Sequence, residues 1–373
     1  MANIPIDILE SEILIRLPIK SLCRFKSVSK SFKTRISSHK FITLHLRHSL
    51  KSNHIFIQVY GKQGLYALDL ASSNYSTVKL PCYVEISNGI IIGDNDSWVG
   101  CCNGLHCFAN IKTSVYVVFN PFTGSYNEIS GPTGRGRESI MISGFGYDDV
   151  KDDYKLVTFK PVFDTGYWYW EIYVYSLNAN SWRYTGIILR GITMSFEQAV
   201  VIDNHLLHLI FSSENITRIG CFDIRTEQWS VLQVPDSIKP DIYRCLPKVG
   251  VFDGCLYLLS EFDIRETELW VMKEYGVKES WMKLLSDFKF EDFTPLGYSK
   301  GSREEMLLWD LYNSNLVSYN IRYKTTKITD INGVTGYSDN PLVSKSFAYF
   351  ANKTLVSVPG GKQASYNGRC REI

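Results

Sequence analysis

The first 46 residues place apolar side chains at the spacing of short amphipathic helices. Asp7 can cap a first helix, and Pro18 ends it. Apolar residues resume from about Ser21 and continue along one face through Ser29, so we expect two or three short helices. The apolar positions are Leu9, Ile13, Leu14, Leu17, Leu22, Phe25, Phe32 and Ile36. A segment this short cannot bury them all within itself, so its spare apolar surface must meet the rest of the chain or another protein.

Beyond residue 50 the pattern changes to short alternating or apolar runs separated by turn residues, which is typical of β-strands. One unit recurs, in which a strand ends at an apolar or aromatic anchor and an aromatic residue usually follows seven positions later. The anchors are Leu68, Phe119, Tyr175, Phe222, Met272 and Tyr319, separated by 51, 56, 47, 50 and 47 residues. Repeats of this length built from short strands predict a β-propeller.

Each repeat has room for four strands, which predicts six four-stranded blades, or seven if the longest interval holds a small extra one. The first repeat lacks a strand, whereas the last two predicted strands, Phe347–Ala351 and Thr354–Val358, have no repeat of their own. We expect the C-terminal strand to complete the first blade and close the ring, because closure removes the open edges. The predicted fold is a small all-α domain (1–46), an all-β propeller (50–358) and a flexible tail (359–373).

Composition supports a globular protein, with 14% aromatic and 21% charged residues. Charge is uneven, because the first 52 residues carry a net +7 and the remainder −5. The basic side chains lie on the polar faces of short helices, so we interpret them as solvated surface or as contacts for an acidic protein, and we expect no nucleic-acid partner.

The nine cysteines are scattered and odd in number. The N-terminal residues do not have the basic and apolar regions of a secretory signal, and no apolar run reaches the roughly 20 residues of a membrane span. We therefore expect reduced thiols in the cytoplasm or nucleus and no membrane contact.

Two groups of residues resemble catalytic or metal sites. Cys101, Cys102, His106 and Cys107 form a Cys/His cluster, but adjacent strand residues point to opposite faces and no second Cys pair completes four zinc ligands. His205 and His208 would need a Ser or Cys on an exposed turn for nucleophilic catalysis, and no Gly-x-Ser-x-Gly is present. We predict buried thiols, a plain hairpin, and no metal, cofactor or catalytic residue.

Two segments are predicted to contact a target. The Gly-rich loop 131–137 does not have the Gly-Lys-Ser/Thr of a phosphate-binding loop, so Arg135 and Arg137 fit a protein contact better. The aromatic run that begins at Tyr167, Trp168 and Tyr169 cannot all face one core, because alternate residues of a strand point to opposite sides. We expect a loop that presents these aromatics to a target, with packing between blades as the equal alternative.

Several motifs of the first 46 residues resemble the F-box. They are Ile4-Pro5-x-Asp7, Glu12-Ile13-Leu14-x-Arg16-Leu17-Pro18-x-Lys20-Ser21-Leu22, Arg24-Phe25-Lys26-x-Val28-Ser29-Lys30, Phe41 and His45-Leu46. Phe32 stands where the family usually has Trp, and the segment Leu9–Glu12 is one residue longer than usual. The resemblance implies binding to a Skp-type adaptor, and through it to a cullin and a RING subunit. The expected apolar contacts are Pro5, Ile13, Leu14, Leu17, Pro18, Leu22 and Val28, with Lys20 and Lys30 at the rim.

The propeller motifs resemble the F-box-associated domain of plant F-box proteins, a group that includes pollen S-locus F-box proteins. They are Cys102-Asn103-Gly104-Leu105, Asn120-Pro121-x-Thr123-Gly124, Gly144-Phe145-Gly146-Tyr147-Asp148 with Asp153-Tyr154-Lys155, and Trp270-Val271-Met272-Lys273-Glu274-Tyr275-Gly276. The double glycine of kelch repeats is missing from the repeats. For the third motif we expect a structural role, as a strand start, a turn and a polar cap.

These resemblances imply the substrate-recognition subunit of an SCF-type ubiquitin ligase, without an active site of its own. Its target would be a basic ribonuclease if the chain is of the S-locus type. The alternatives are a propeller scaffold that acts without a ligase, or a propeller enzyme such as a glycosidase. A glycosidase needs two carboxylates flanking the scissile bond, and the sequence does not bring such a pair together.

Overall fold

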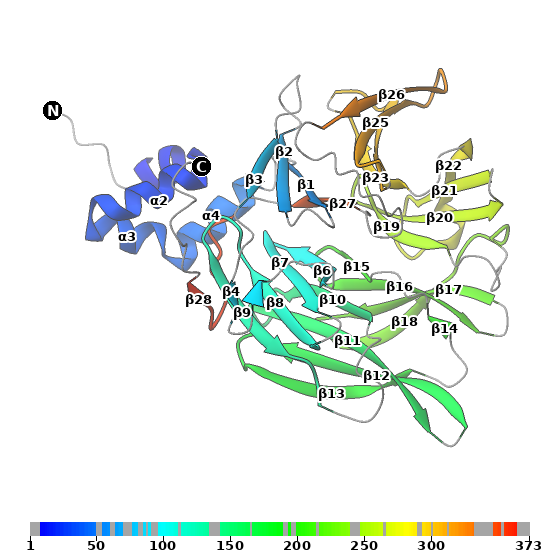
Figure 1. Ribbon diagram of the computed structural model, residues 1–373, viewed down its shortest axis with the longest axis horizontal. Helices are drawn as coiled ribbons and strands as arrows, with labels where there is room; N and C mark the ends of the chain where they lie inside the picture. Colours follow the sequence, from blue (N-terminus) through cyan, green and yellow to red (C-terminus); the bar gives the residue numbers. More distant parts are fainter. Residues whose placement is uncertain are drawn as a thin grey trace.

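The computed structural model describes residues 8–49, 54–59, 64–69, 77–80, 85–86, 89–90, 96–110, 113–133, 142–164, 166–188, 193–194, 199–213, 216–238, 247–263, 266–288, 293–299, 301–311, 313–331, 346–351 and 354–363. A group of short N-terminal helices lies beside a larger body of twisted antiparallel sheets (Figure 1). This arrangement agrees with the predicted all-α segment followed by an all-β propeller.

The helical domain consists of the one-turn elements η1 (Leu9–Ile13) and η2 (Leu14–Arg16) and the helices α2 (Ile19–Val28), α3 (Lys30–Ile36) and α4 (His39–Ser49). The predicted continuous apolar face through Ser29 is divided between α2 and α3. Ser29 is extended, with φ −156° and ψ 156°, and its side chain accepts a hydrogen bond from the Phe32 N–H at 3.2 Å. It therefore ends one helix and caps the next. Among the described residues, no helix combines the length and apolar character needed to cross a membrane.

The strands of the described residues form seven sheets. The first contains β1 (His54–Val59), β2 (Gly64–Asp69), β3 (Thr77–Leu80) and β27 (Ser346–Ala351), and β4 (Glu85–Ile86) with β5 (Gly89–Ile90) is a small ribbon. The next contains β6 (Asp96–Cys102), β7 (Leu105–Asn110), β8 (Val115–Phe119), β9 (Ser125–Ser130) and β28 (Lys362–Gln363). It is followed by β10 (Ile142–Asp148), β11 (Asp153–Asp164), β12 (Tyr167–Ser176) and β13 (Ser181–Ile188).

The other three sheets continue in chain order. One contains β14 (Thr193–Met194), β15 (Val200–Ile202), β16 (Leu206–Ser213), β17 (Ile216–Asp223) and β18 (Gln228–Leu232). The next contains β19 (Lys248–Phe252), β20 (Cys255–Asp263), β21 (Glu266–Met272) and β22 (Trp281–Phe288), with the short helix η3 (Lys278–Ser280) before β22. The last contains β23 (Phe293–Tyr298), β24 (Glu305–Asp310), β25 (Asn315–Asn320) and β26 (Thr325–Asp330).

The prediction that every blade has four strands is wrong. Apart from the ribbon, four of the described sheets have four strands and two have five. The additional strands are β14, which pairs with β16 alongside β15, and β28, which pairs with β9 at the outer edge of its sheet. The repeat length alone could not reveal them, because β14 is a two-residue pairing and β28 comes from the distant C-terminal segment.

The predicted closure by a C-terminal strand is confirmed. β27 pairs antiparallel with β1, with Ser346 opposite Val59 and Ala351 opposite His54. Its sheet packs on the last one through a shared core that includes Leu68, Trp309 and Ala348. The second predicted terminal strand, 354–358, is wrong. These residues form no strand, although Val358 is buried beside the β6–β9 sheet.

In four of the sheets, the recurring anchor residue lies directly opposite the aromatic residue that follows it in the sequence, across the hairpin of the last two strands of the repeat. Phe119 lies opposite Tyr126, Tyr175 opposite Trp182, Phe222 opposite Trp229 and Met272 opposite Trp281. Such pairs stabilise antiparallel hairpins through direct side-chain contact. Leu68 lies opposite Thr77 instead, and its predicted aromatic partner Tyr75 lies outside the described residues.

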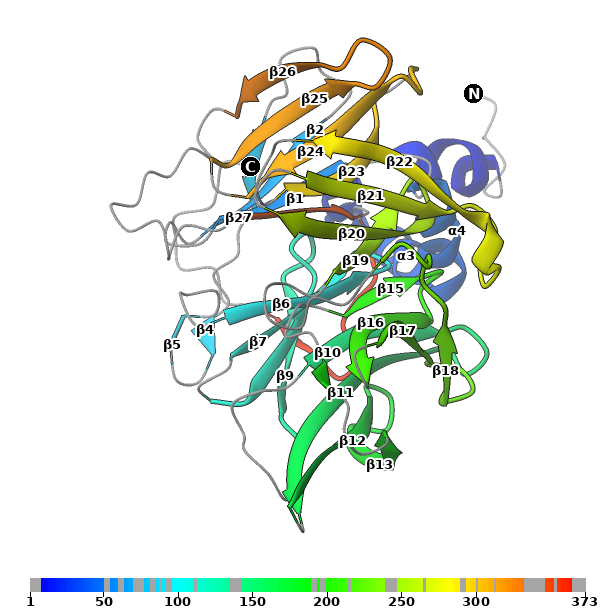
Figure 2. The ribbon, with the colours of Figure 1, turned by 90° about the vertical axis from the view of Figure 1, so that its right-hand side faces the viewer.

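The turns of a propeller sheet lie at two opposite faces, because successive strands run in opposite directions. The helices contact one of these faces. His39 of α4 pairs with Asp152 in the β10–β11 turn at 3.3 Å, and Phe122 in the β8–β9 turn packs against the helical core. The β11–β12 hairpin ends at the other face, and Figure 2 shows its tip projecting beyond the neighbouring strands. Twelve extended residues of β11 place the tip roughly 40 Å from the turn at Asp152.

Candidate functional site

The helical domain exposes apolar side chains that its own core does not use. Ile8, Ile13 and Val28 are 49%, 40% and 68% exposed. Val28 ends α2, and the exposed Lys30 begins α3 just after it. Each of these side chains is free to contact a partner protein in the described structure.

The residues predicted to contact an adaptor fall into two groups. Ile13, Pro18, Lys20, Val28 and Lys30 are exposed, and Leu17 is half-buried. The structure places Leu14 and Leu22, by contrast, in the domain's own core, with exposures of 1% and 0%. Helical spacing could not separate these groups, because a turn of helix presents apolar residues to its own neighbours and to a partner alike. Pro5 lies outside the described residues.

The long β11–β12 hairpin carries the predicted aromatic run. The run lies within strand β12, so the expected loop is wrong. Cross-strand pairing continues to Asp164 opposite Tyr167, because β11 supplies partners as far as the tip. Trp168 is 47% exposed and packs its ring 5.2 Å from that of Phe163, itself 57% exposed. Sequence reasoning missed Phe163, although the pattern Pro-Val-Phe before Asp164 extends the apolar run of β11.

The remaining aromatics of the hairpin have different environments. Tyr169 is half-buried, whereas Trp170 is buried in the core shared with the β14–β18 sheet. The aromatic run therefore serves both alternatives, a free surface at the tip and packing between sheets at its base. Arg135, Arg137 and the side chain of Tyr167 lie outside the described residues.

Cys102, His106 and Cys107 of the propeller are almost completely buried, and Cys101 beside them is half-buried. Burial lowers the pKa of His106 to about 3 and raises that of Cys101 to about 12, and it also raises the pKa of Cys107. Neutral thiols of this kind are poor nucleophiles and poor metal ligands. Within the described ranges, no three His, Cys, Asp or Glu side chains are grouped to hold a metal ion.

His208 is fully buried and takes part in a small network with Tyr275 and Cys221. Its Nε2 lies 2.7 Å from the hydroxyl of Tyr275, and that hydroxyl is 3.2 Å from the Cys221 sulfur. Burial lowers the pKa of His208 to about 4 and raises that of Cys221. A neutral histidine beside a protonated thiol is a structural contact, without an activated nucleophile.

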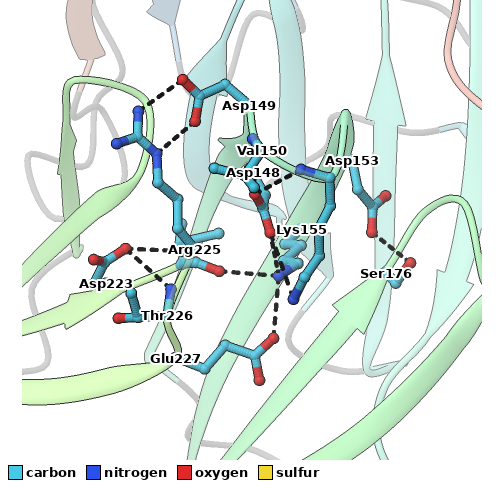
Figure 3. A network of polar contacts seen from close by, with 12 residues as sticks. Asp148, Asp149, Val150, Asp153, Lys155, Ser176, Asp223, Arg225, Thr226 and Glu227 are labelled. Atoms are coloured by element: carbon cyan, nitrogen blue, oxygen red, sulfur yellow. Dashed lines mark hydrogen bonds and ion pairs between the residues drawn. The ribbon is translucent and has the colours of Figure 1, made fainter.

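A buried ionic network joins the β10–β13 sheet to the β14–β18 sheet (Figure 3). Lys155 Nζ donates to Asp148 Oδ2 at 2.8 Å, to the Ile224 carbonyl at 3.0 Å and to Glu227 Oε1 at 3.1 Å. Glu227 also accepts from Arg183. The predicted polar cap is confirmed, because Asp148 Oδ1 accepts the backbone N–H groups of the turn at residues 150 and 151.

The electrostatics of this network favour its charged form. Burial alone would raise the pKa of Asp148, but hydrogen bonds from Lys155 and the turn hold it below the usual value. Burial likewise opposes the charge of Glu227, and Lys155 and Arg183 lower its pKa. Burial would lower the pKa of Lys155, yet its two carboxylate partners raise it. Each charge is paired, so the network clamps two sheets together, and no unpaired acid or base is left for chemistry.

Comparison with known proteins agrees with this division of the chain. Residues 1–44 match the F-box domain family, and residues 36–351 match the F-box associated beta propeller domain family. The F-box protein CPR1 of Arabidopsis thaliana is 30% identical over 364 residues, covering 88% of this chain and 86% of that protein. An F-box/kelch-repeat protein of the same plant is 28% identical over 359 residues, covering 92% and 95%.

Solved structures are less similar. TolB from Acinetobacter baumannii has 10% identity and a TM-score of 0.49, covering 84% of this chain and 73% of that one, which is too low to add to the assignment. Neither of the two plant relatives is named as an S-locus protein, so that detail stays a prediction. The matches to both domain families are sufficient for membership. The chain belongs to the F-box proteins that carry an F-box-associated β-propeller domain.

Proposed function

We propose that this chain is the substrate-recognition subunit of an SCF-type ubiquitin ligase. Its helical domain binds a Skp-type adaptor, and through it a cullin and a RING subunit, while its propeller binds a target protein. The observation that carries this proposal is the F-box match together with the exposed apolar residues Ile13 and Val28. Ubiquitin transfer then follows from holding the target near the catalytic subunits, so the chain needs no catalytic residue.

The proposed adaptor surface consists of exposed residues of the helical domain. Ile13, Pro18 and Val28 supply apolar contact, and Lys20 and Lys30 supply positive charge at the rim. Leu14 and Leu22 support the surface from inside the domain core. Pro5 and Leu17 complete the set predicted from the sequence. The net charge of +7 over residues 1–52 favours an acidic adaptor surface.

The proposed target surface is the tip of the β11–β12 hairpin, with Trp168 and Phe163 as anchors and Tyr169 beside them. Exposed aromatic residues are frequent binding hot spots. The tip lies on the face opposite the helices, so a target could bind there while the adaptor is bound. Arg135, Arg137 and Tyr167 belong to the same proposal on the basis of sequence alone.

Adaptor binding is tested by copurification of the full chain with a Skp-type adaptor. Val28→Asp should lower the retained adaptor about tenfold or more, because it places a charge in an apolar contact. Val231→Asp is the matched control, because Val231 is 45% exposed on the propeller strand β18. If the wild-type chain retains no adaptor, the non-ligase scaffold is the better description. If Val28→Asp and Ile13→Asp both retain wild-type amounts, the proposed surface is wrong.

Target binding is tested by capture from plant cell extract with the proteasome inhibited. Replacement of Trp168 and Phe163 by Ala should remove proteins that the wild type captures. Tyr323→Ala is the control, because Tyr323 is 66% exposed in the β25–β26 turn at the helix-side face. Equal capture by all three proteins would place the target elsewhere on the propeller.

A further inference from the structure

The C-terminal segment 354–363 runs between the helical domain and the β6–β9 sheet, where β28 lies beside β9 (Figure 1). Only Lys362 and Gln363 of this segment are in a strand, yet three of its side chains are almost completely buried. Thr354, Leu355 and Val358 are 0%, 1% and 4% exposed. These buried residues come before residue 359, where the flexible tail is predicted to begin, and Lys362 and Gln363 within the predicted tail pair with β9.

The segment is fixed to the propeller mainly by Asn120. This side chain is fully buried, and its Nδ2 donates to the carbonyls of Thr354 at 3.0 Å and Val356 at 2.7 Å. Its Oδ1 accepts the N–H groups of Phe122 at 2.8 Å and Thr123 at 3.2 Å. Both donors and both acceptor positions of the amide are therefore in use. Only the amide side chains of Asn and Gln can donate two and accept two hydrogen bonds in this way. The shorter Asn also reaches the N–H groups of the β8–β9 turn that follows it.

Further contacts continue the attachment along β9. Ser125 Oγ accepts the Val358 N–H at 3.2 Å, and Lys362 and Gln363 pair with Tyr126 and Ser125. A Cβ at Gly361 would lie 2.8 Å from the carbonyl oxygens of Tyr126 and Val358, a distance that real Cβ atoms do not reach. Glycine is therefore required for the segment to lie this close to β9.

The same segment enters the core of the helical domain. Leu355 packs among Leu14, Leu22, Ile36 and Phe41, and Phe122 packs against that core from the β8–β9 turn. Asn120 thus positions both side chains. It bonds the carbonyls of Thr354 and Val356, which flank Leu355, and it bonds the backbone N–H of Phe122. The pair of His39 and Asp152 also joins the helices to the propeller. Its two side chains are 76% and 61% exposed, so the pair adds little stability.

We infer that residues 354–363 are a tie that fixes the orientation of the helical domain on the propeller, with Leu355 as its anchor in the helices and Asn120 as its anchor in the propeller. The inference goes beyond the proposed adaptor and target surfaces, because it concerns how the two domains are held together and not what either domain binds. Its consequence does rest on the proposed function: the tie sets the distance between a bound adaptor and a bound target, which makes Leu355 a positioning residue.

The tie is tested on full-length protein by hydrogen exchange and small-angle scattering. Leu355→Ala should reduce protection of the α2–α4 amides about thirtyfold or more, the fold-change that corresponds to the lower end of measured Leu-to-Ala costs. Amides of β16 and β17 should keep wild-type protection. Ser357→Ala is the matched control, because Ser357 is exposed within the same segment. Leu355→Met should stay close to wild type.

Scattering distinguishes a tie from local packing. Replacement of both Leu355 and Phe122 by Ala should increase the maximum dimension, because the helical domain is then held mainly by its chain connection. Unchanged dimensions would overturn the inference, even if helix protection falls. Loss of protection in β16 and β17 would also overturn it, because Leu355 would then support the whole fold. Neither measurement contains an adaptor or a target, so failure of the proposed function would leave these results unchanged.

Discussion

Replacement of Lys155 by Met tests whether the buried ionic network holds two sheets together. The substitution keeps most of the apolar stem and removes the ammonium group of a side chain that is 4% exposed. Three acceptors lose their donor at once, the carboxylates of Asp148 and Glu227 and the Ile224 carbonyl. Removal of one partner from a buried ion pair typically costs about 3–5 kcal/mol. We expect about 3 kcal/mol, because Asp148 keeps its backbone donors and Glu227 keeps Arg183.

The assay is urea unfolding at pH 7, with Lys151→Met as the matched control. Lys151 lies 3.9 Å from the same Asp148 carboxylate but is 59% exposed, so its loss should cost less than about 1 kcal/mol. Adding Asp148→Asn to Lys155→Met should recover part of the loss, because it removes the uncompensated charge. Equal costs for Lys155→Met and Lys151→Met would refute the reasoning.

The same network predicts a pH dependence. Because Asp148 and Glu227 have lowered pKa values in the folded protein, their stabilisation is complete above the ordinary values of 3.8 and 4.5. It is lost as the pH falls below those values and the carboxylates become protonated. The difference between wild type and Lys155→Met should therefore shrink on acidification below about pH 4.

Three further predictions concern buried groups of the propeller. Burial lowers the pKa of His208 from 6.5 to about 4, so on acidification from pH 6.5 to 4 the unfolded chain takes up a proton before the folded protein does, and the free energy of unfolding falls. His208→Gln should make this fall smaller in urea unfolding measured across that pH range, and an unchanged slope would contradict the prediction. Gly146→Ala should cost about 1–3 kcal/mol in the same assay, because its Cβ would lie 2.5 Å from the Asn204 carbonyl oxygen; a neutral effect would contradict that approach. Cys102 and Cys107 should resist iodoacetamide in native protein and react after unfolding, as peptide mass spectrometry would show, and native labelling would argue against their burial.

The repeat architecture could be predicted because it is local in sequence. Pairs such as Phe222 and Trp229 lie seven residues apart and face each other across one hairpin, so the spacing reports the pairing directly. The first repeat lacks one strand, and this predicts that a C-terminal strand pairs with it, as β27 does with β1. In each case a periodic pattern and one unpaired edge were enough.

Long-range contacts could not be predicted in the same way. Nothing in the spacing of residues 14–41 indicates that Leu355 completes their core, and Glu227 is 72 residues from the lysine that it binds. The sequence predicts a loop at Trp168 where the structure has strand β12, because the alternation of the aromatic run does not show how far β11 extends beside it. These features depend on which sheets become neighbours, and local periodicity does not determine that.

The position of Leu355 has a consequence for synthesis of the protein on the ribosome. The helices are made first, but the leucine that completes their core is made about three hundred residues later, after β27 has also emerged. A chain terminated before residue 346 lacks both the closing strand and this leucine. Its defect therefore extends from the last sheet to the N-terminal helices, so that truncated products would present an incomplete F-box as well as an open propeller.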